Sequence, residues 1–106
     1  MAKYLWQVSY TTEGLKGVMK EGGNSRAKVI GKLIEAHGGK LEAFYFAFGE
    51  ADVYLIVDLP GNLEASAISL AVGASGAARV RTTVLLTPKE VDAAIKVKVG
   101  YRAPGA

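Results

Sequence analysis

The side chains that could carry out chemistry are few in this sequence, and each stands alone in its stretch of chain. His37 is the only histidine, and it precedes two glycines at the end of a helix-like pattern. A histidine there can act as a general base or a metal ligand, but a helix C-terminus also favours an imidazolium for purely electrostatic reasons. A single histidine is weak support for a metal centre, so we favour the structural interpretation and expect no metal site.

Two other residues complete the set of candidate catalytic groups. Asp52 follows Glu50 in a short acidic turn between two strand-like stretches. Acidic side chains in such a turn can bind a hard cation or act as an acid–base pair, although they more often stabilise the turn itself. Tyr10 carries a phenol that could handle a proton beside an apolar substrate. The catalytic candidates are therefore His37, Asp52 and Tyr10.

Aromatic and basic residues on the predicted strands suggest a ligand site. Trp6, Tyr45 and Tyr54 could line a pocket for a small hydrophobic molecule, or they could be core and interface residues. Arg79 and Arg81 alternate on one strand, where they could hold an anion or protect a sheet edge from aggregation.

Composition excludes several classes of function. The 106 residues contain no cysteine, which removes disulfides and thiolate chemistry and fits a cytoplasmic protein. A net charge of +3 is too small for a nucleic-acid footprint, and no stretch is long and apolar enough for a membrane span. No cofactor motif is present, so we expect no cofactor, nucleic-acid or membrane partner.

The elements that must position these residues alternate between strand and helix patterns. Alternation with period two predicts strands near residues 3–10, 40–48, 53–59 and 79–86. Apolar stripes with helical period predict helices near 25–37 and 63–75, with a further helical pattern that ends at Gly22-Gly23. The glycine pair either breaks one helix or separates two.

The faces of these elements can also be predicted. We expect Arg26 to face water, and we expect the second main helix to pack on the sheet through a stripe that includes Leu63, Ala67 and Leu70. In the second strand, strict alternation places Leu41 on the face opposite Phe44.

Together these elements predict one α+β domain over residues 1–106. The expected fold is a ferredoxin-like βαββαβ sandwich, with a four-stranded antiparallel sheet and two helices on one face. Thr87-Pro88 with Glu90 begins a C-terminal helix over 88–98, after a core of 1–87 and before a tail of 99–106.

The second face of the predicted sheet is too apolar to stay in water. Both faces of the strands carry apolar residues, whereas a solvated face would show clear alternation of apolar and polar types. Pairing of sheets in a homodimer or homotrimer would bury it. The alternative is that the C-terminal helix and tail fold back over that face.

Four stretches together resemble a known family. They are YTTEGLKG from Tyr10, GGKL from Gly38, FAFGEAD from Phe46 and TTVLLTP from Thr82. The chain resembles a GYD domain protein, a small bacterial family, over nearly its whole length. Gly49 and Asp52 of the signature are present, and Ala51 stands in the place of the tyrosine. The resemblance implies a ferredoxin-like fold comparable to the dimeric α/β-barrel proteins, and no settled activity.

The leading hypothesis is a cytoplasmic homo-oligomer that binds a small apolar or anionic ligand, or serves in assembly, without catalysis. The alternative is a cofactor-independent enzyme of the dimeric α/β-barrel kind, a small monooxygenase or isomerase acting on a hydrophobic molecule. A third possibility is an effector-sensing oligomer with an anion site, formed by Arg79 and Arg81, between subunits.

Overall fold

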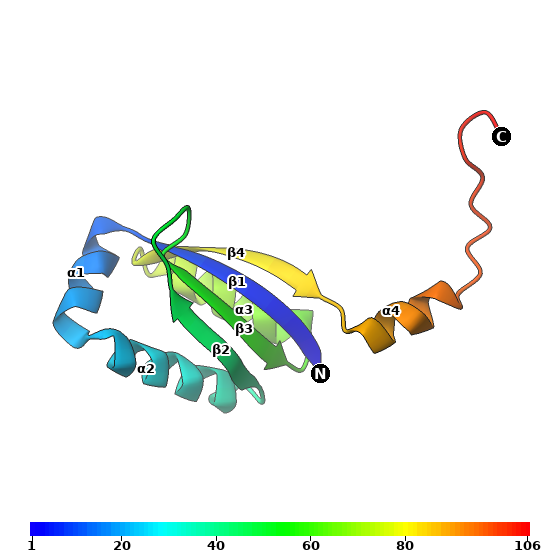
Figure 1. Ribbon diagram of the computed structural model, residues 1–106. Coiled ribbons are helices and arrows are strands. Elements are labelled where there is room, and N and C mark those ends of the chain that lie inside the picture. The colour runs from blue at the N-terminus through cyan, green and yellow to red at the C-terminus, as the bar shows by residue number, and fades with distance from the viewer.

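The computed structural model describes residues 1–106 and confirms the predicted α+β class. One four-stranded antiparallel sheet combines with four helices (Figure 1). In chain order the elements are β1 (Ala2–Tyr10), α1 (Thr12–Glu21), α2 (Gly23–Ala36), β2 (Lys40–Phe46), β3 (Val53–Leu59), α3 (Asn62–Ala74), β4 (Ala78–Leu85) and α4 (Pro88–Ile95). None of these helices is long and apolar enough to cross a membrane.

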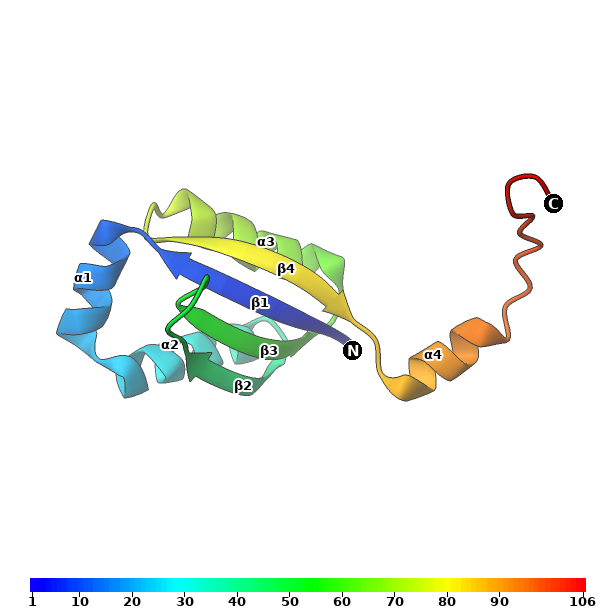
Figure 2. The same ribbon diagram turned by 45° about the horizontal axis from the view of Figure 1, so that its top comes forward.

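The sheet has the strand order β2-β3-β1-β4, and each neighbouring pair is antiparallel. α2 and α3 lie on the same face of the sheet, as the two views in Figures 1 and 2 show. The core lies between this face and the two helices, with most of its residues on the central strands β1 and β3. Its buried members are Tyr4, Trp6, Ile34, Val53, Leu55, Val57, Leu59, Ala65 and Ile68.

The first helical region is two helices, which resolves a choice that the sequence left open. Gly22 lies between α1 and α2 with φ of 92°, a conformation that side chains with a Cβ rarely adopt. Its backbone N–H donates to the carbonyl of Val18 and so caps α1. The chain therefore turns at Gly22, and α2 begins in a new direction beneath the sheet.

A β-bulge in β2 overturns the predicted alternation. The register pairs Leu41 with Val57 and Phe44 with Leu55, with a shift between Leu41 and Ala43. Val57 and Leu55 share one face, so Leu41 and Phe44 do as well. The extra residue of the bulge turns the strand by one position, which simple period-two counting cannot anticipate.

The predicted packing face of α3 was wrong. Leu63 and Leu70 are 79% and 73% exposed, while Ala65 and Ile68 are buried against the sheet. Both stripes of this helix consist of apolar and small residues, so hydrophobicity alone did not distinguish them.

The C-terminal segment extends away from the sheet (Figures 1 and 2). α4 begins with the predicted capping box, in which Glu90 N–H donates to Thr87 Oγ1 at 3.1 Å and Thr87 N–H donates to Glu90 Oε1 at 2.9 Å. The helix ends at Ile95, earlier than predicted, and every residue from Pro88 to Ala106 is exposed. The segment does not fold back over the open face of the sheet.

Candidate ligand-binding site

A cavity of about 50 Å³ lies between α2, α3 and the helix-covered face of the sheet. Thirteen of its fifteen lining residues are hydrophobic, and the two exceptions are Arg26 and Ser69. The cavity adjoins a groove of about 300 Å³ between α2 and α3, and Tyr10 and Arg26 belong to the walls of both. An apolar interior that opens next to a few polar groups is the usual form of a small-molecule site.

Successive turns of two helices form the roof of the cavity. α2 contributes Ile30, Leu33 and Ile34, and α3 contributes Ile68 and Val72. These spacings place the side chains of each helix on one side, facing the sheet. The floor is formed by residues that the strands point towards the helices: Trp6, Val8, Phe44, Val53, Leu55 and Val80.

Trp6 is the predicted ligand-binding residue that the structure places in this cavity. Its side chain is buried, with the residue only 4% exposed, and its Nε1–H has no hydrogen-bond partner. An unpaired buried donor costs roughly 1–3 kcal/mol relative to a paired one.

Tyr10 and Arg26 stand where the cavity meets the groove. Tyr10 is half-buried at the end of β1, and burial raises the pKa of its phenol, while the nearby positive charge of Arg26 opposes that rise. Arg26 is itself half-buried, with Nη1 3.9 Å from Glu21 Oε2. The prediction that Arg26 faces water was wrong. Its spacing of one and two helical turns from Ile30 and Leu33 is the signal that sequence reasoning missed.

Asp52 contributes to the position of Tyr10. Its carboxylate accepts a hydrogen bond from the backbone N–H of Tyr10 at 2.8 Å. Its own N–H donates to the carbonyl of Val8, also at 2.8 Å. Asp52 thereby ties the β2–β3 connection to the end of β1, whereas Glu50 is exposed in the same turn.

His37 lies at the C-terminal end of α2 and borders the groove together with Tyr10. The side chain is exposed, and its Nδ1 is 2.9 Å from the carbonyl oxygen of Leu33. A histidine that donates from Nδ1 to a backbone carbonyl presents Nε2 as its free nitrogen.

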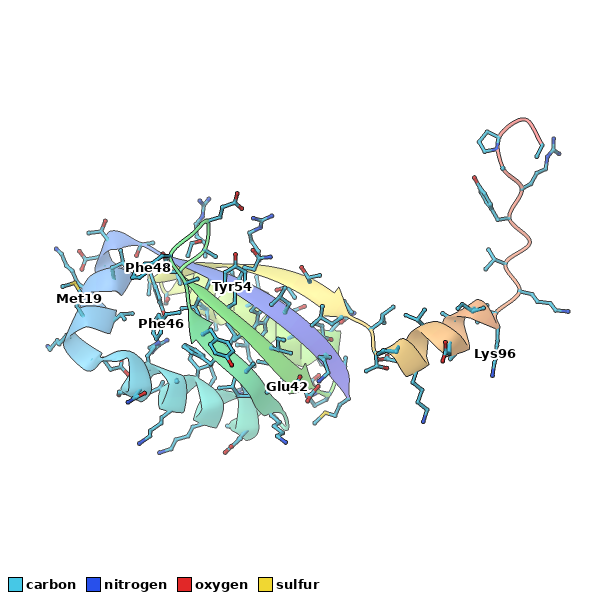
Figure 3. All side chains as sticks on the ribbon, in the orientation of Figure 1. Met19, Glu42, Phe46, Phe48, Tyr54 and Lys96 are labelled. Carbon is cyan, nitrogen blue, oxygen red and sulfur yellow. The ribbon has the colours of Figure 1, made fainter.

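The remaining predicted ligand residues lie on the other face of the sheet, far from the cavity floor. There, Tyr45 on β2 pairs with Tyr54 on β3. Tyr54 pairs in turn with Gln7 on β1, and Gln7 pairs with Arg81 on β4. Arg79 and Arg81 are exposed on β4. Figure 3 shows Tyr54 on this open face. The structure thus separates the predicted ligand set into Trp6 on the covered face and the other four on the open face.

The three phenylalanines differ in their surroundings. Phe44 lines the cavity, and the ring of Phe46 packs edge-on against it with centroids 5.4 Å apart. Phe48 is fully exposed in the turn after β2 (Figure 3). Only the first of these aromatic side chains can contact a ligand in the cavity.

One end of the open face carries a small ion network. Lys3 Nζ donates to Asp58 Oδ1 at 2.8 Å and to Glu42 Oε2 at 2.5 Å. These bonds, to Asp58 first, raise the pKa of the Lys3 amine. No group of three or more histidine, aspartate or glutamate side chains comes together as a metal site anywhere in the chain.

Comparison with known proteins gives one match. A family model described as the GYD domain matches residues 4–95, which covers β1 through α4. No curated protein and no solved structure matches the chain.

Proposed function

The chain belongs to the GYD domain family, and from that membership and the cavity described above we propose that it is a homo-oligomer that binds a small, mainly apolar molecule without catalysis. The observation that carries this proposal is the apolar cavity beneath α2 and α3, together with the adjoining groove that Tyr10, Arg26 and His37 border.

The state of the candidate catalytic groups supports binding rather than catalysis. The carboxylate of Asp52 already accepts a hydrogen bond from the Tyr10 backbone. The phenol of Tyr10 is protonated at neutral pH because its ordinary pKa is 10.0, and burial raises that pKa further, so the phenol can donate a hydrogen bond. A binding site needs such fixed donors, whereas a general base needs a free proton acceptor.

A cofactor-independent enzyme is the second candidate, because Tyr10 and His37 border the same groove. A substrate in the groove would lie between a phenol and an imidazole, which together can move a proton. The two functions are distinguished by incubating the recovered ligand with the protein. An unchanged ligand supports binding alone, and conversion that is lost in Tyr10→Phe supports the enzyme.

We assign the fold to the ferredoxin-like class and the open face of its sheet to self-association. The strand order β2-β3-β1-β4 supports the first assignment, because two βαβ units with interleaved strands produce it. The open face has an apolar centre that includes Leu5 and Ile56, with arginines on β4 and carboxylates at the opposite corner. A second copy placed face to face would cover the apolar centre and bring arginines towards carboxylates, as a two-fold interface allows.

Native mass spectrometry of the purified protein, followed by denaturation, tests both parts of the proposal. We expect a closed oligomer that carries a non-covalent mass, released on denaturation. Val72→Phe, which adds volume to the cavity roof, should lose that mass and keep the oligomer, while Leu70→Phe on the exposed stripe of the same helix should keep both. A monomer would contradict self-association, and a mass retained in Val72→Phe would contradict the cavity as the site.

A further inference from the structure

The two edges of the sheet differ in how they are protected. The sheet ends at β2 on one side and at β4, beside α3, on the other (Figure 2). β2 has a bulge between Leu41 and Ala43, and the charged residues Lys40 and Glu42 are exposed beside it. Bulges and charges of this kind keep an edge strand from pairing with another chain. β4 runs for eight residues without a bulge or a proline, so its outer row of backbone N–H and C=O groups is open to a further strand.

α3 leaves the helix side of this edge uncovered. Val84 pairs with the buried Tyr4, so it points to the helix-covered face, yet it is 57% exposed. Thr82, two residues earlier on the same face, is exposed as well. The hydroxyl of Tyr4 donates to Asn62 Oδ1 at 2.6 Å, which ties the start of α3 to β1. A groove of about 470 Å³ therefore remains between α3 and β4, with the exposed side chain of Leu70 on its wall.

The exposed surface of α3 lacks the charges that a helix in water carries. α3 contains one charged residue, Glu64, whereas α2, of similar length, contains four. A helix without a polar, charged side is normally buried against a partner. The uncharged helix and the unprotected strand form the two walls of the same groove, so one partner can cover both. The exposed positions of α3 after Glu64 are Ser66, Ala67, Leu70, Ala71, Gly73 and Ala74.

The charges of β4 select one register for pairing with a second copy. Cross-strand partners point to the same face, so two copies with their helices on one face pair with one residue of β4 opposite itself. Arg81 at that position would bring two arginines together, and Val80 would bring Arg79 and Arg81 together. Like charges directly opposite each other are destabilising. With Thr82 at that position, each arginine faces an uncharged residue, and the whole range Arg79–Leu85 is paired.

We propose that β4 is the edge at which two copies of this chain join their sheets, antiparallel and about a two-fold axis at Thr82. The four strands of each copy then form one continuous sheet. The two α3 helices lie side by side on one face of it, and their Leu70 side chains close the grooves over the joined edges. The bulged and charged β2 edges do not pair, so the contact closes as a pair. This contact is separate from the open face and goes beyond the proposed function.

Hydrogen exchange of the unmodified protein at a series of concentrations tests the proposal directly. Peptides that cover Arg79–Leu85 should exchange about tenfold more slowly as the concentration rises, because outward amides of β4 gain hydrogen bonds. Peptides that cover Lys40–Phe46, on the other edge strand, are the matched control and should not change. Exchange in β4 that stays independent of concentration up to the millimolar range would overturn the proposal.

Cysteine cross-linking tests the register. The chain contains no cysteine, so a single introduced cysteine can form a disulfide only with another copy. Thr82→Cys should oxidise to a covalent dimer, because residues opposite each other in an antiparallel pair have Cα atoms roughly 4.5–5.5 Å apart, within the range of a disulfide. Thr83→Cys is the matched control, because its two copies would be diagonal neighbours roughly 7–8 Å apart, beyond that range. Thermal unfolding of each reduced variant establishes that the fold is intact.

Further substitutions in the Thr82→Cys background separate the edge from the open face. Leu70→Glu should abolish the covalent dimer, because it places carboxylates on the uncharged surface of α3, whereas Leu70→Phe should keep it, because the groove has room for the larger ring. Ile56→Ala, on the open face, should leave cross-linking unchanged.

Two results would overturn the edge pairing. Faster cross-linking in Thr83→Cys than in Thr82→Cys, or cross-linking that is lost with Ile56→Ala, would place the contact on the open face. An oligomer in which Thr82→Cys does not cross-link would leave self-association through the open face standing and exclude β4 as the joining edge.

Discussion

The two faces of the sheet can be compared residue by residue along β3. Val53, Leu55, Val57 and Leu59 point to the helices and are buried, whereas Tyr54, Ile56 and Asp58 point the other way and are half-buried. Apart from Asp58, the side chains on both faces are large and apolar or aromatic. The two faces therefore differ less in composition than in what covers them.

This difference assigns separate roles to the two faces. The covered face has a packed core that contains one cavity, lined in part by Trp6, and this cavity is the proposed ligand site. The open face has an apolar centre with no helix over it, and we propose that a second copy supplies the cover. A fold with helices on one face only can thus bind a ligand on one side and itself on the other.

The largest effect on stability should appear when two neighbouring residues of β3 that point to opposite faces are truncated in separate variants. Leu55→Ala should lower the free energy of unfolding by about 2–5 kcal/mol, because it leaves a cavity in the core. Ile56→Ala should cost less in dilute protein, and its cost should grow with protein concentration as the second copy covers it. Urea unfolding at several protein concentrations measures both. Equal, concentration-independent losses would mean that the open face has a cover within its own chain or none at all.

The next effect compares the packed and open sides of α1. A Cβ at Gly14 would overlap the carbonyl oxygen of Ala77, which accepts hydrogen bonds from Thr11, while a Cβ at Gly17 would meet nothing. Gly14→Ala should therefore destabilise the protein by roughly 1–3 kcal/mol. Gly17→Ala should stabilise it by about 0.5–1 kcal/mol, because alanine loses less entropy in a helix. Thermal unfolding of the two variants checks the signs, and equal signs would contradict this packing of α1.

Part of this architecture was predictable because local chemistry determines it. Thr11 and Thr87 cap their helices through their own hydroxyls, and Gly38 adopts φ of 81° after α2, so these boundaries follow from residue type. The alternation of β1 and β3 predicted their strands correctly. Such features depend on residues within one turn of one another.

The rest depended on contacts between distant residues. The bulge after Leu41 shifts one strand against another, and nothing within β2 records it. The two stripes of α3 are equally apolar, so only the sheet decides which one is buried. Arg26 enters the candidate site because the chain turns at Gly22, which brings the N-terminal part of α2 near Tyr10 at the end of β1. Trp6 was predicted as a ligand residue from its type, but its partnerless Nε1–H required the packed structure.

A smaller effect is the dependence of stability on pH that Tyr10, on the covered face, introduces. Burial raises the pKa of Tyr10 above its ordinary 10.0, so the folded protein holds this proton more tightly than the unfolded chain does. The contribution to stability is complete below pH 10 and is lost as the pH rises through the higher folded value. Ultraviolet difference absorbance should show one tyrosine ionisation above pH 10 that is absent in Tyr10→Phe. Arg26→Gln should raise this pKa further, because the arginine charge lowers it; a fall would contradict the placement of Arg26 beside the phenol.

The smallest effect should come from deleting the C-terminal segment after Leu86. Every residue of α4 and the tail is exposed, so their removal takes no apolar surface out of the core. We expect the free energy of unfolding of the truncated protein to change by less than about 0.5 kcal/mol, the range of ordinary surface substitutions. α4 has eight residues, and helices that short are marginal in water without packing partners, so far-ultraviolet circular dichroism should register little loss beyond those residues. A truncation that lowers stability only at high protein concentration would show that the apolar residues Val91 and Ile95 pack on a second copy. A loss at every concentration would show that the segment packs on its own chain, and the comparison between a covered and an open face would then fail.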